Sequence, residues 1–280
     1  MCIRSVFTMK KIIIITGATS GMGLETLKLL AKNGHTVYGT ARKKEDFKTI
    51  EEAGGKPLQA DMNDYESLEK AVETIIKEEG RIDVLDNNAG YGLYGTVEEI
   101  PLKDAKNQLE VNLFGLARLT QLVIPHMRAQ KSGTIINISS MGGKIYTPFG
   151  AWYHASKHAL EGFSDCLRLE LRHFGIHVVV VEPGSIATPW NDIMRKNLEK
   201  YSTSGPYKET AENFIARSER SSKTNEGSPP SIIADVILKI VNARKPKTRY
   251  VAGKYAKLLI SIRKFLGDRI YDKVIDRMIK

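Results

Sequence analysis

A tyrosine and a lysine stand at helical spacing in the middle of the chain. Tyr153 is followed four positions later by Lys157. Positions four apart lie on one face of a helix, so the phenol and the ammonium are neighbours. A cation beside a phenol favours the phenolate and lowers the pKa of the tyrosine from about 10. The pair therefore predicts a tyrosine that exchanges a proton with a bound substrate.

The same spacing occurs a second time, at Tyr250 and Lys254. Spacing alone does not decide between the two pairs. Ser139 and Ser140 come fourteen and thirteen residues before Tyr153, at the end of a predicted strand. The second pair has no comparable polar support, so we expect the first pair to perform the chemistry.

A glycine-rich segment between a predicted strand and a predicted helix is suited to bind a phosphate. It reads Thr16-Gly17-Ala18-Thr19-Ser20-Gly21-Met22-Gly23. Glycines allow a tight turn and a close backbone approach, and the N–H groups at the helix start favour a pyrophosphate. The spacing G-x3-G-x-G differs from the G-x-G-x-x-G fingerprint, so an ordinary strand–turn–helix corner is the alternative.

The end of the next predicted strand bears on the choice of dinucleotide. NAD-binding folds place an acidic residue about twenty residues beyond the glycine loop, where it binds the ribose. Here the chain reads Gly39-Thr40-Ala41-Arg42-Lys43-Lys44, and Arg42 could form a bidentate contact with a 2′-phosphate. This favours NADP(H). NAD(H) is the alternative, because Glu45 or Asp46 could still bind a ribose.

Predicted strands and helices alternate along most of the chain. Strictly alternating units indicate parallel strands joined by right-handed helical crossovers, which is an α/β, doubly wound, Rossmann-type sheet. Ligands then bind at the carboxyl ends of the strands. The predicted strands are 12–16, 35–40, 57–60, 82–85, 134–139, 176–182 and 248–251, and the longer helices are 22–33, 64–78, 102–130, 150–174, 231–243 and 255–280.

We expect one domain, residues 9–253, followed by a basic helical extension, residues 254–280. Within the domain, residues 189–230 are polar and poorly patterned, which predicts a loop that covers the substrate. The segment before Met9 lacks the apolar core of a signal peptide, and Met9 is a possible start.

Composition excludes several classes of protein. The chain has 280 residues, 42% of them apolar, and only two cysteines, Cys2 and Cys166. These values predict a globular protein of a reducing cytoplasm without a disulfide framework, and the six histidines form no metal-ligand cluster. Of the net charge of +10, residues 231–280 contribute +9. No nucleic-acid-binding motif accompanies this charge, so nucleic acid is not an expected partner.

The ordered motifs resemble the short-chain dehydrogenase/reductase family over about residues 11–188. Residues 37–42 and the extended C-terminus are most similar to the 17-beta-hydroxysteroid dehydrogenase-like and retinol dehydrogenase-like branch. The elements that match are Thr16-Gly17-x3-Gly21-x-Gly23, Asp61, Asn87-Asn88-Ala89-Gly90, Asn112, Ser139, Tyr153-x3-Lys157 and Pro183-Gly184.

The resemblance implies a role for each of these residues. Tyr153 would be the general acid/base, Lys157 would bind the nicotinamide ribose and lower the tyrosine pKa, Ser139 would bind the substrate oxygen, and Asn112 would hold a water linked to Lys157. The remaining cofactor-binding residues would be Gly17, Thr19, Ser20, Gly21, Met22, Gly23, Arg42, Asp61, Met62, Asn88, Ala89, Gly90, Pro183, Gly184, Ile186 and Thr188. Asp86 departs from the family pattern, which has an aliphatic residue there.

The expected function is interconversion of a carbonyl and a primary or secondary alcohol on a largely apolar substrate, with NADP(H). The alternatives are a 3-oxoacyl thioester reductase and a non-catalytic dinucleotide sensor. The two long helices, 102–130 and 150–174, resemble the pair that forms dimer interfaces in the family, which implies a homodimer or homotetramer.

The basic tail allows two interpretations. Leu259, Ile262, Leu266, Ile270 and Val274 recur every three or four positions among cations. A basic amphipathic helix can lie on a membrane surface. A helix that covers the substrate cleft is preferred, because Asp268, Asp272 and Asp276 interrupt the basic face.

Overall fold

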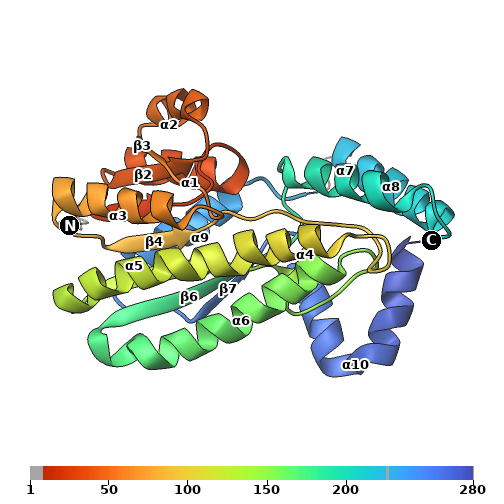
Figure 1. Cartoon of the computed structure of the whole chain (residues 1–280). Coiled ribbons are helices and arrows are strands. Elements are labelled where there is room, and N and C mark those ends of the chain that lie inside the picture. Colours follow the sequence, from red (N-terminus) through yellow and green to blue (C-terminus); the bar gives the residue numbers. More distant parts are fainter. Residues whose placement is uncertain (1–8, 225–226, 280) are drawn as a thin grey trace.

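A seven-stranded parallel sheet forms the centre of the molecule (Figure 1). The computed structural model describes residues 9–224 and 227–279, so the segment before Met9 lies outside the described residues. The strand order is β3-β2-β1-β4-β5-β6-β7, which confirms the doubly wound prediction. The strands are β1 (Ile12–Ile15), β2 (Thr36–Ala41), β3 (Lys56–Gln59), β4 (Val84–Asn87), β5 (Gly133–Ile138), β6 (Ile176–Pro183) and β7 (Arg249–Ala252).

Two apolar layers hold helices against the sheet, one on each face. Side chains alternate along a strand, so Ile12 and Ile14 contact one layer and Ile13 and Ile15 the other. Burying each isoleucine contributes about 1.5–3 kcal/mol. Figure 1 shows the two sets of helices. One face is covered by α3 (Tyr65–Glu79), α5 (Gly115–Gln130) and α6 (Ala151–Leu171), and the other by α1 (Gly21–Lys32), α2 (Phe47–Glu52) and α9 (Ser231–Asn242).

The strand order reverses beside β1, which pairs with β2 on one side and β4 on the other. Crossovers leave the sheet on opposite faces at this point, so a crevice opens at the carboxyl ends of β1 and β4. The glycine loop follows β1 at this edge, and Asn88, Ala89 and Gly90 follow β4. The topology therefore brings together two motifs that are about seventy residues apart.

Residues 189–230 are mainly helical, and the prediction of a loop was wrong. The segment contains α7 (Trp190–Ser202) and α8 (Lys208–Lys223). Its apolar residues are few, but their spacing is helical: Met194 and Leu198 are four apart, and both are buried against an aromatic cluster. Tertiary packing thus stabilises helices whose polar composition hides them in the sequence. Residues 225–226 lie outside the described residues.

The C-terminal helix α10 (Ala256–Ile279) is broken at Gly267. Gly267 has φ 72° and ψ 179°, a conformation that glycine adopts readily and other residues do not. The break changes the direction of the second half of the helix. The prediction of one continuous apolar stripe along the helix was therefore wrong after Gly267. Leu266 and Ile270 are exposed, and Tyr271 and Ile275 are buried instead. Figure 1 shows the two halves as the arms of a V below the domain.

Asp86 lies in β4 and is fully buried. Neither of its carboxyl oxygens has a hydrogen-bond partner among residues 9–224 and 227–279. Burial raises the pKa of Asp86 from its usual 3.8 to about 8. The carboxyl is therefore mostly protonated at neutral pH, which avoids an unpaired charge in the core.

We expect the stability of the protein to fall as pH rises, because of Asp86. The folded protein keeps the Asp86 proton at pH values where the unfolded chain has lost it, because the pKa of Asp86 is raised from 3.8 to about 8 on folding. The resulting stability is complete below pH 3.8 and is lost as pH rises through about 8. Asp86→Asn removes this titration, so the wild type should lose on the order of a few kcal/mol relative to the variant between pH 5 and pH 8.5. Denaturant unfolding at both pH values measures the difference, and a constant difference between the two proteins would contradict it.

Candidate active site

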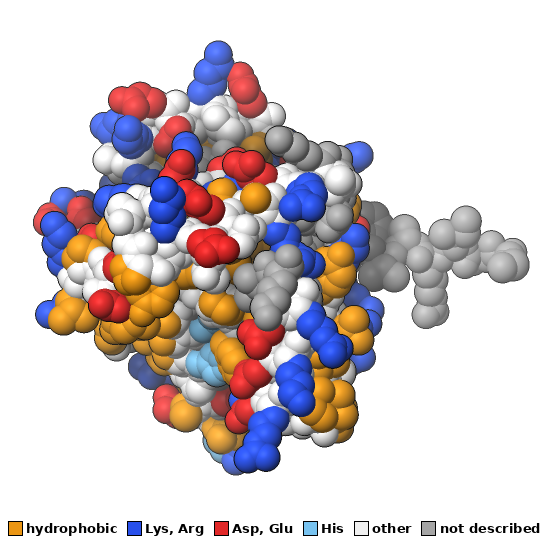
Figure 2. Space-filling view, turned by 90° about the vertical axis from the view of Figure 1, so that its right-hand side faces the viewer, with side chains coloured by type: hydrophobic (Ala, Val, Ile, Leu, Met, Phe, Trp, Pro, Cys, Tyr) orange, Lys and Arg blue, Asp and Glu red, His pale blue; other side chains and the backbone are white. Residues whose placement is uncertain are grey.

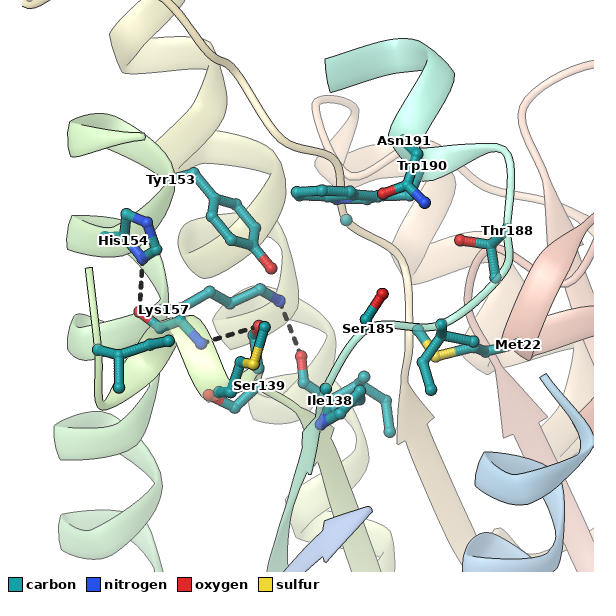
Figure 3. A pocket seen from close by; sticks show the side chains of 18 of the residues that line it. Met22, Ile138, Ser139, Tyr153, His154, Lys157, Ser185, Thr188, Trp190 and Asn191 are labelled. Atoms are coloured by element: carbon teal, nitrogen blue, oxygen red, sulfur yellow. Dashed lines mark hydrogen bonds between the residues drawn. The ribbon is translucent and has the colours of Figure 1, made fainter. Parts of the chain in front are cut away.

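The structure brings Tyr153 and Lys157 together at the carboxyl edge of the sheet. Both side chains are buried, and Figure 3 shows the phenol oxygen and the ammonium pointing into the same part of a cavity. The ammonium donates a hydrogen bond to the carbonyl oxygen of Ile138, at 2.8 Å. Burial lowers the pKa of Lys157 to about 8, and the nearby Glu161 carboxylate opposes this. Lys157 is thus fixed at the end of β5 with its charge close to Tyr153.

The second pair lies elsewhere. Tyr250 packs against the apolar layer on the α1 and α9 side of the sheet, and its hydroxyl accepts a hydrogen bond from the Lys247 amide at 3.1 Å. Lys254 lies over the ring of Tyr255, 5.1 Å from the ring centre. Neither Tyr250 nor Lys254 lines the cavity that contains Tyr153. Of the two pairs, the first lines this cavity.

The tyrosine pKa differs from expectation. Burial is the largest influence and raises the pKa of Tyr153 well above its usual value, and Ser140, which lowers it, is the smaller influence. A net lowering of the Tyr153 pKa was therefore wrong for this arrangement, because removing the phenolate from water costs more free energy than its polar neighbours restore. At neutral pH Tyr153 is protonated and can donate its proton.

The serine beside Tyr153 is Ser140, which corrects the assignment of Ser139. Side chains alternate along a strand, so Ser139 faces the same side of the sheet as Asn137. Its hydroxyl lies near Gly143 and Glu161, because a Cβ added to Gly143 would lie 2.7 Å from Ser139 Oγ and 3.0 Å from Glu161 Cγ. Ser140 lies one residue beyond, where the chain turns. Its hydroxyl accepts from the Gly142 amide at 3.0 Å and forms the hydrogen bond that lowers the Tyr153 pKa. Strand alternation could have separated the two serines.

Asn112 lies in a π-helical turn, Glu110–Phe114, between α4 (Leu102–Leu109) and α5. The predicted helix 102–130 is thus interrupted at this residue. The Asn112 side chain is fully buried and bonds both the amide and the carbonyl of Tyr91, each at 3.1 Å, and also Ser156 Oγ at 3.1 Å. A Cβ at Gly90 would lie 3.2 Å from Asn112 Oδ1 and 3.6 Å from Lys157 Nζ. Asn112 therefore fixes the loop after β4 beside the lysine.

The glycine loop forms a cradle that side chains would fill. Gly17 and Gly21 have positive φ, at 65° and 54°. A Cβ at Gly23 would lie 2.4 Å from the Gly17 carbonyl oxygen and 2.5 Å from Asn88 Nδ2. Ser20 begins α1 without a side-chain cap, so the first N–H groups of α1 are available to an anion. Thr19 in this loop and Met22 in the first turn of α1 are partly exposed. This geometry fits a dinucleotide pyrophosphate.

The loop after β4 is attached to this cradle. Asn88 Nδ2 donates to the Thr16 carbonyl at 2.9 Å and to the Gly17 carbonyl at 3.2 Å. The Ala89 amide donates to Thr16 Oγ1 at 2.9 Å. These bonds fix the glycine loop relative to the loop after β4, which contains Gly90 and lies beside Lys157. The two segments that are suited to bind a dinucleotide are therefore held rigidly relative to each other.

The remaining predicted cofactor residues lie on either side of the cradle. Arg42 is exposed at the end of β2, beside Asp61 and the buried Met62, which follow β3. On the other side, Thr188 is near Gly21, because a Cβ there would lie 3.3 Å from Thr188 Cγ2. Pro183, Gly184, Ile186 and Thr188 line the cavity with Met22 and Asn88.

The cavity in front of Tyr153 has a volume of about 200 Å³ and a largely apolar wall. Trp190, at the start of α7, lies 5.1 Å from Tyr153 between ring centres, and Tyr94 lies 6.0 Å from it. Phe149 and Phe214 complete an aromatic cluster with them, under α7 and α8. The arrangement can orient an apolar molecule whose single polar atom faces Tyr153 and Ser140.

The sequence pattern described as short chain dehydrogenase matches residues 11–199. The chain belongs to the short-chain dehydrogenase family. It is 38% identical over 249 residues to oxidoreductase BOA17 of Botryotinia fuckeliana, covering 88% of this chain and 89% of that one. It is 37% identical over 253 residues to 3-ketodihydrosphingosine reductase of Bacteroides thetaiotaomicron, covering 90% and 91%.

A third relative of this short-chain dehydrogenase is the NADPH-dependent 3-dehydrocapnine reductase of Ornithobacterium rhinotracheale, 34% identical over 280 residues, covering 95% of this chain and 96% of that one. Among solved structures, a short-chain dehydrogenase from Streptomyces avermitilis matches with a TM-score of 0.77 and 29% identity, covering 95% and 97%. The family supports an oxidoreductase with a nicotinamide dinucleotide. The hydroxysteroid and retinol branch is not confirmed.

Several residues of this short-chain dehydrogenase site were missed in the sequence. Tyr94, Ile145, Trp190 and Asn191 line the cavity. Trp190 lies in the segment taken for a loop, and no local pattern marks it as a wall of the site. Of three aromatic residues near Tyr153 in the sequence, Phe149 joins the cluster beside it, whereas Tyr146 and Trp152 pack in other apolar clusters.

His154 also lines the cavity of this short-chain dehydrogenase, but its ring is fully engaged with backbone. One ring nitrogen pairs with the Gly142 carbonyl at 2.9 Å, and the other accepts from the Thr147 amide at 3.0 Å. Burial lowers the pKa of His154 to about 4, so the ring is neutral. The ring therefore holds the loop after Ser140 in place.

Proposed function

We propose that the protein is an NADP(H)-dependent reductase of an apolar ketone, with Tyr153 as the general acid. The observation that supports this best is the protonated, buried Tyr153, which lies beside Lys157 and Ser140 in an aromatic cavity. A reduction needs a proton donor at the substrate oxygen and an environment that excludes water. A protonated Tyr153 can donate to the substrate oxygen at neutral pH, so reduction is the direction that we propose.

The chain's own groups have distinct tasks in this proposal. When bound, the nicotinamide supplies the hydride that reduces the carbonyl carbon. Ser140 and Tyr153 donate hydrogen bonds to the carbonyl oxygen, and Tyr153 transfers its proton to that oxygen as the alcohol forms. Lys157, held by the Ile138 carbonyl, stabilises the resulting phenolate and binds the nicotinamide ribose. Asn112 keeps the loop beside Lys157 in place and would hold the water linked to it.

The substrate class follows from the wall of the cavity and from the relatives. Trp190, Tyr94 and Phe149 offer apolar surface and few hydrogen bonds. Two relatives are named as reductases of 3-ketodihydrosphingosine and 3-dehydrocapnine. We therefore infer a ketone on a long apolar chain, and a ketosteroid or retinal remains the alternative from the branch that the sequence resembles.

A substrate panel followed by NADPH absorbance tests this class. The panel contains 3-ketodihydrosphingosine, a ketosteroid, retinal, a short aliphatic ketone and a 3-oxoacyl thioester. The highest kcat/KM is expected for the long-chain ketone. A preference for the thioester would favour the alternative of a 3-oxoacyl thioester reductase. NADPH binding with no turnover of any ketone or aldehyde would favour a dinucleotide sensor.

We also propose that the protein forms a dimer through α5 and α6. These helices lie side by side on one face of the sheet, and Leu169 of α6 is 51% exposed. Leu169→Asp should convert the dimer to a monomer, because a carboxylate would be buried in the interface without a partner. Light scattering at micromolar concentration is expected to give twice the chain mass of 31.3 kDa for the wild type. A monomeric wild type would contradict the proposal.

A further inference from the structure

The first arm of α10 exposes large apolar side chains on its outer side. Ala256 and Leu259 face the domain and are buried. Leu258 and Phe265 are seven positions apart, which places them on one helix face, away from the domain. Leu258 is 60% exposed and Phe265 is 74% exposed. Leu266 and, after the break, Ile270 are also exposed, on either side of the bend at Gly267.

The second arm exposes cations on its outer side. Tyr271 and Ile275 face the domain and are buried. Arg269 and Lys273 stand two positions before and after Tyr271, which places each about 160° around the helix from it. Lys257 and Lys264 directly precede two of the exposed apolar residues of the first arm, Leu258 and Phe265. A band of cations therefore borders the apolar surface along both arms.

Two of the three aspartates of α10 have partners within the folded chain. Asp268 pairs with Arg263. Asp272 accepts a hydrogen bond from the Tyr146 hydroxyl at 2.8 Å. The second contact holds Asp272 beside the domain, whereas the first lies within α10. Part of the acidic charge that interrupts the basic pattern is thus paired within the folded chain, and α10 keeps an excess of cations.

We propose that the outer face of α10 docks on an anionic lipid surface. This face consists of Leu258, Phe265, Leu266 and Ile270 with Lys257, Lys264, Arg269 and Lys273. Figure 1 shows the two arms projecting below the sheet, and the lower part of Figure 2 shows hydrophobic and Lys or Arg side chains, with acidic side chains next to them. Apolar side chains enter the boundary of the acyl chains, while the cations meet the phosphate groups.

Charge complementarity favours lipid over a second copy of the chain. In a two-fold contact the same patch is present on both sides, so the cations of one outer face would meet those of the other. Juxtaposed like charges oppose such an association. The described residues contain no helix long and apolar enough to cross a membrane. The proposed attachment is therefore peripheral and depends on salt.

The inner face of α10 connects this surface to the catalytic cavity. Leu259, Tyr271 and Ile275 pack against Met141 and Ile145. Met141 and Ile145 also line the cavity that contains Tyr153. The helix thus covers one wall of the cavity, as the sequence favoured, while its opposite side remains free for lipid. The docking proposal goes beyond the proposed function and does not depend on it.

Co-sedimentation of the full chain with vesicles tests the proposal. Vesicles of phosphatidylcholine with 30% phosphatidylglycerol should bind the protein, and pure phosphatidylcholine should bind much less. In 0.5 M NaCl binding should fall several-fold. The double variant F265S/L266S should lower the partition coefficient at least tenfold, because two apolar side chains no longer enter the interface. K264Q/R269Q/K273Q should lower it about 100-fold on anionic vesicles.

A matched control separates the outer face of α10 from general surface effects. Val97 and Leu102 are exposed apolar residues outside α10, and V97S/L102S should bind as the wild type does. Circular dichroism should show that all variants keep the wild-type helix content. No binding of the wild type to anionic vesicles would overturn the proposal, and so would equal binding by F265S/L266S. Self-association that requires Phe265, without vesicle binding, would assign the face to a second copy instead.

Discussion

Replacing Tyr153 with phenylalanine is expected to lower kcat by about 10² to 10⁴ and to leave NADPH affinity nearly unchanged. The hydroxyl is the proton donor to the substrate oxygen, and losing a general acid typically has an effect of this size. The ring remains to pack against Trp190, so the cavity should keep its shape. Steady-state kinetics and a fluorescence titration with NADPH measure the two quantities.

Tyr250→Phe is the matched control, because Tyr250-x3-Lys254 repeats the spacing of the catalytic pair outside the cavity. It should retain near wild-type kcat. If Tyr153→Phe stayed active and Tyr250→Phe were inactive, the selection of the first pair would be wrong. A large fall in NADPH affinity in Tyr153→Phe would instead show that the tyrosine acts mainly in cofactor binding.

Arg42→Ala is expected to weaken NADPH binding by about 10- to 100-fold and to leave NADH binding nearly unchanged. Arg42 lies exposed where β2 ends, at the position where NAD-binding folds have a carboxylate. A guanidinium can bind a 2′-phosphate through charge-assisted hydrogen bonds that together contribute about 1.5–3 kcal/mol, and NADH lacks that phosphate. Titration of both dinucleotides with both proteins gives the comparison.

The wild type itself should bind NADPH more tightly than NADH. Arg244→Ala is the control, since Arg244 is another exposed arginine that lies after α9, away from the glycine loop. It should change neither affinity. Equal wild-type affinities for the two dinucleotides would contradict the assignment, and so would an Arg42→Ala variant that loses both to the same degree.

The sequence predicted the sheet well because its signals are local. Buried strands such as Ile12–Ile15 are short apolar runs, and Asp64 caps α3 by accepting from the Ser67 amide at 3.2 Å. The glycines at positions 17 and 21, which adopt positive φ, indicate the phosphate-binding loop in the sequence. Tyr153, Lys157 and Asn88 follow from motifs whose spacing reflects one helix or one loop.

The features that the sequence missed depend on contacts between distant segments. Helices α7 and α8 form because Met194, Leu198 and Phe214 pack on the aromatic cluster, which their own polar segment does not reveal. The raised pKa of Tyr153 is a result of burial, so the helical spacing with Lys157 gave the opposite sign. The assignment of Ser140 in place of Ser139 as the serine beside Tyr153 depends on which side of the sheet each side chain faces after β5. The break at Gly267 changed which residues of α10 are buried.

Transfer of deuterium from labelled NADPH tests the central claim most directly. The wild type is incubated with NADPH that carries deuterium at the transferred position of nicotinamide C4, together with 3-ketodihydrosphingosine, and the product is analysed by mass spectrometry. The account predicts an alcohol with one deuterium on the former carbonyl carbon, formed in proportion to the NADPH consumed and at least 100-fold more slowly by Tyr153→Phe. Labelled NADPH that binds but yields no labelled alcohol from this ketone, a ketosteroid, retinal or a short aliphatic ketone would contradict it.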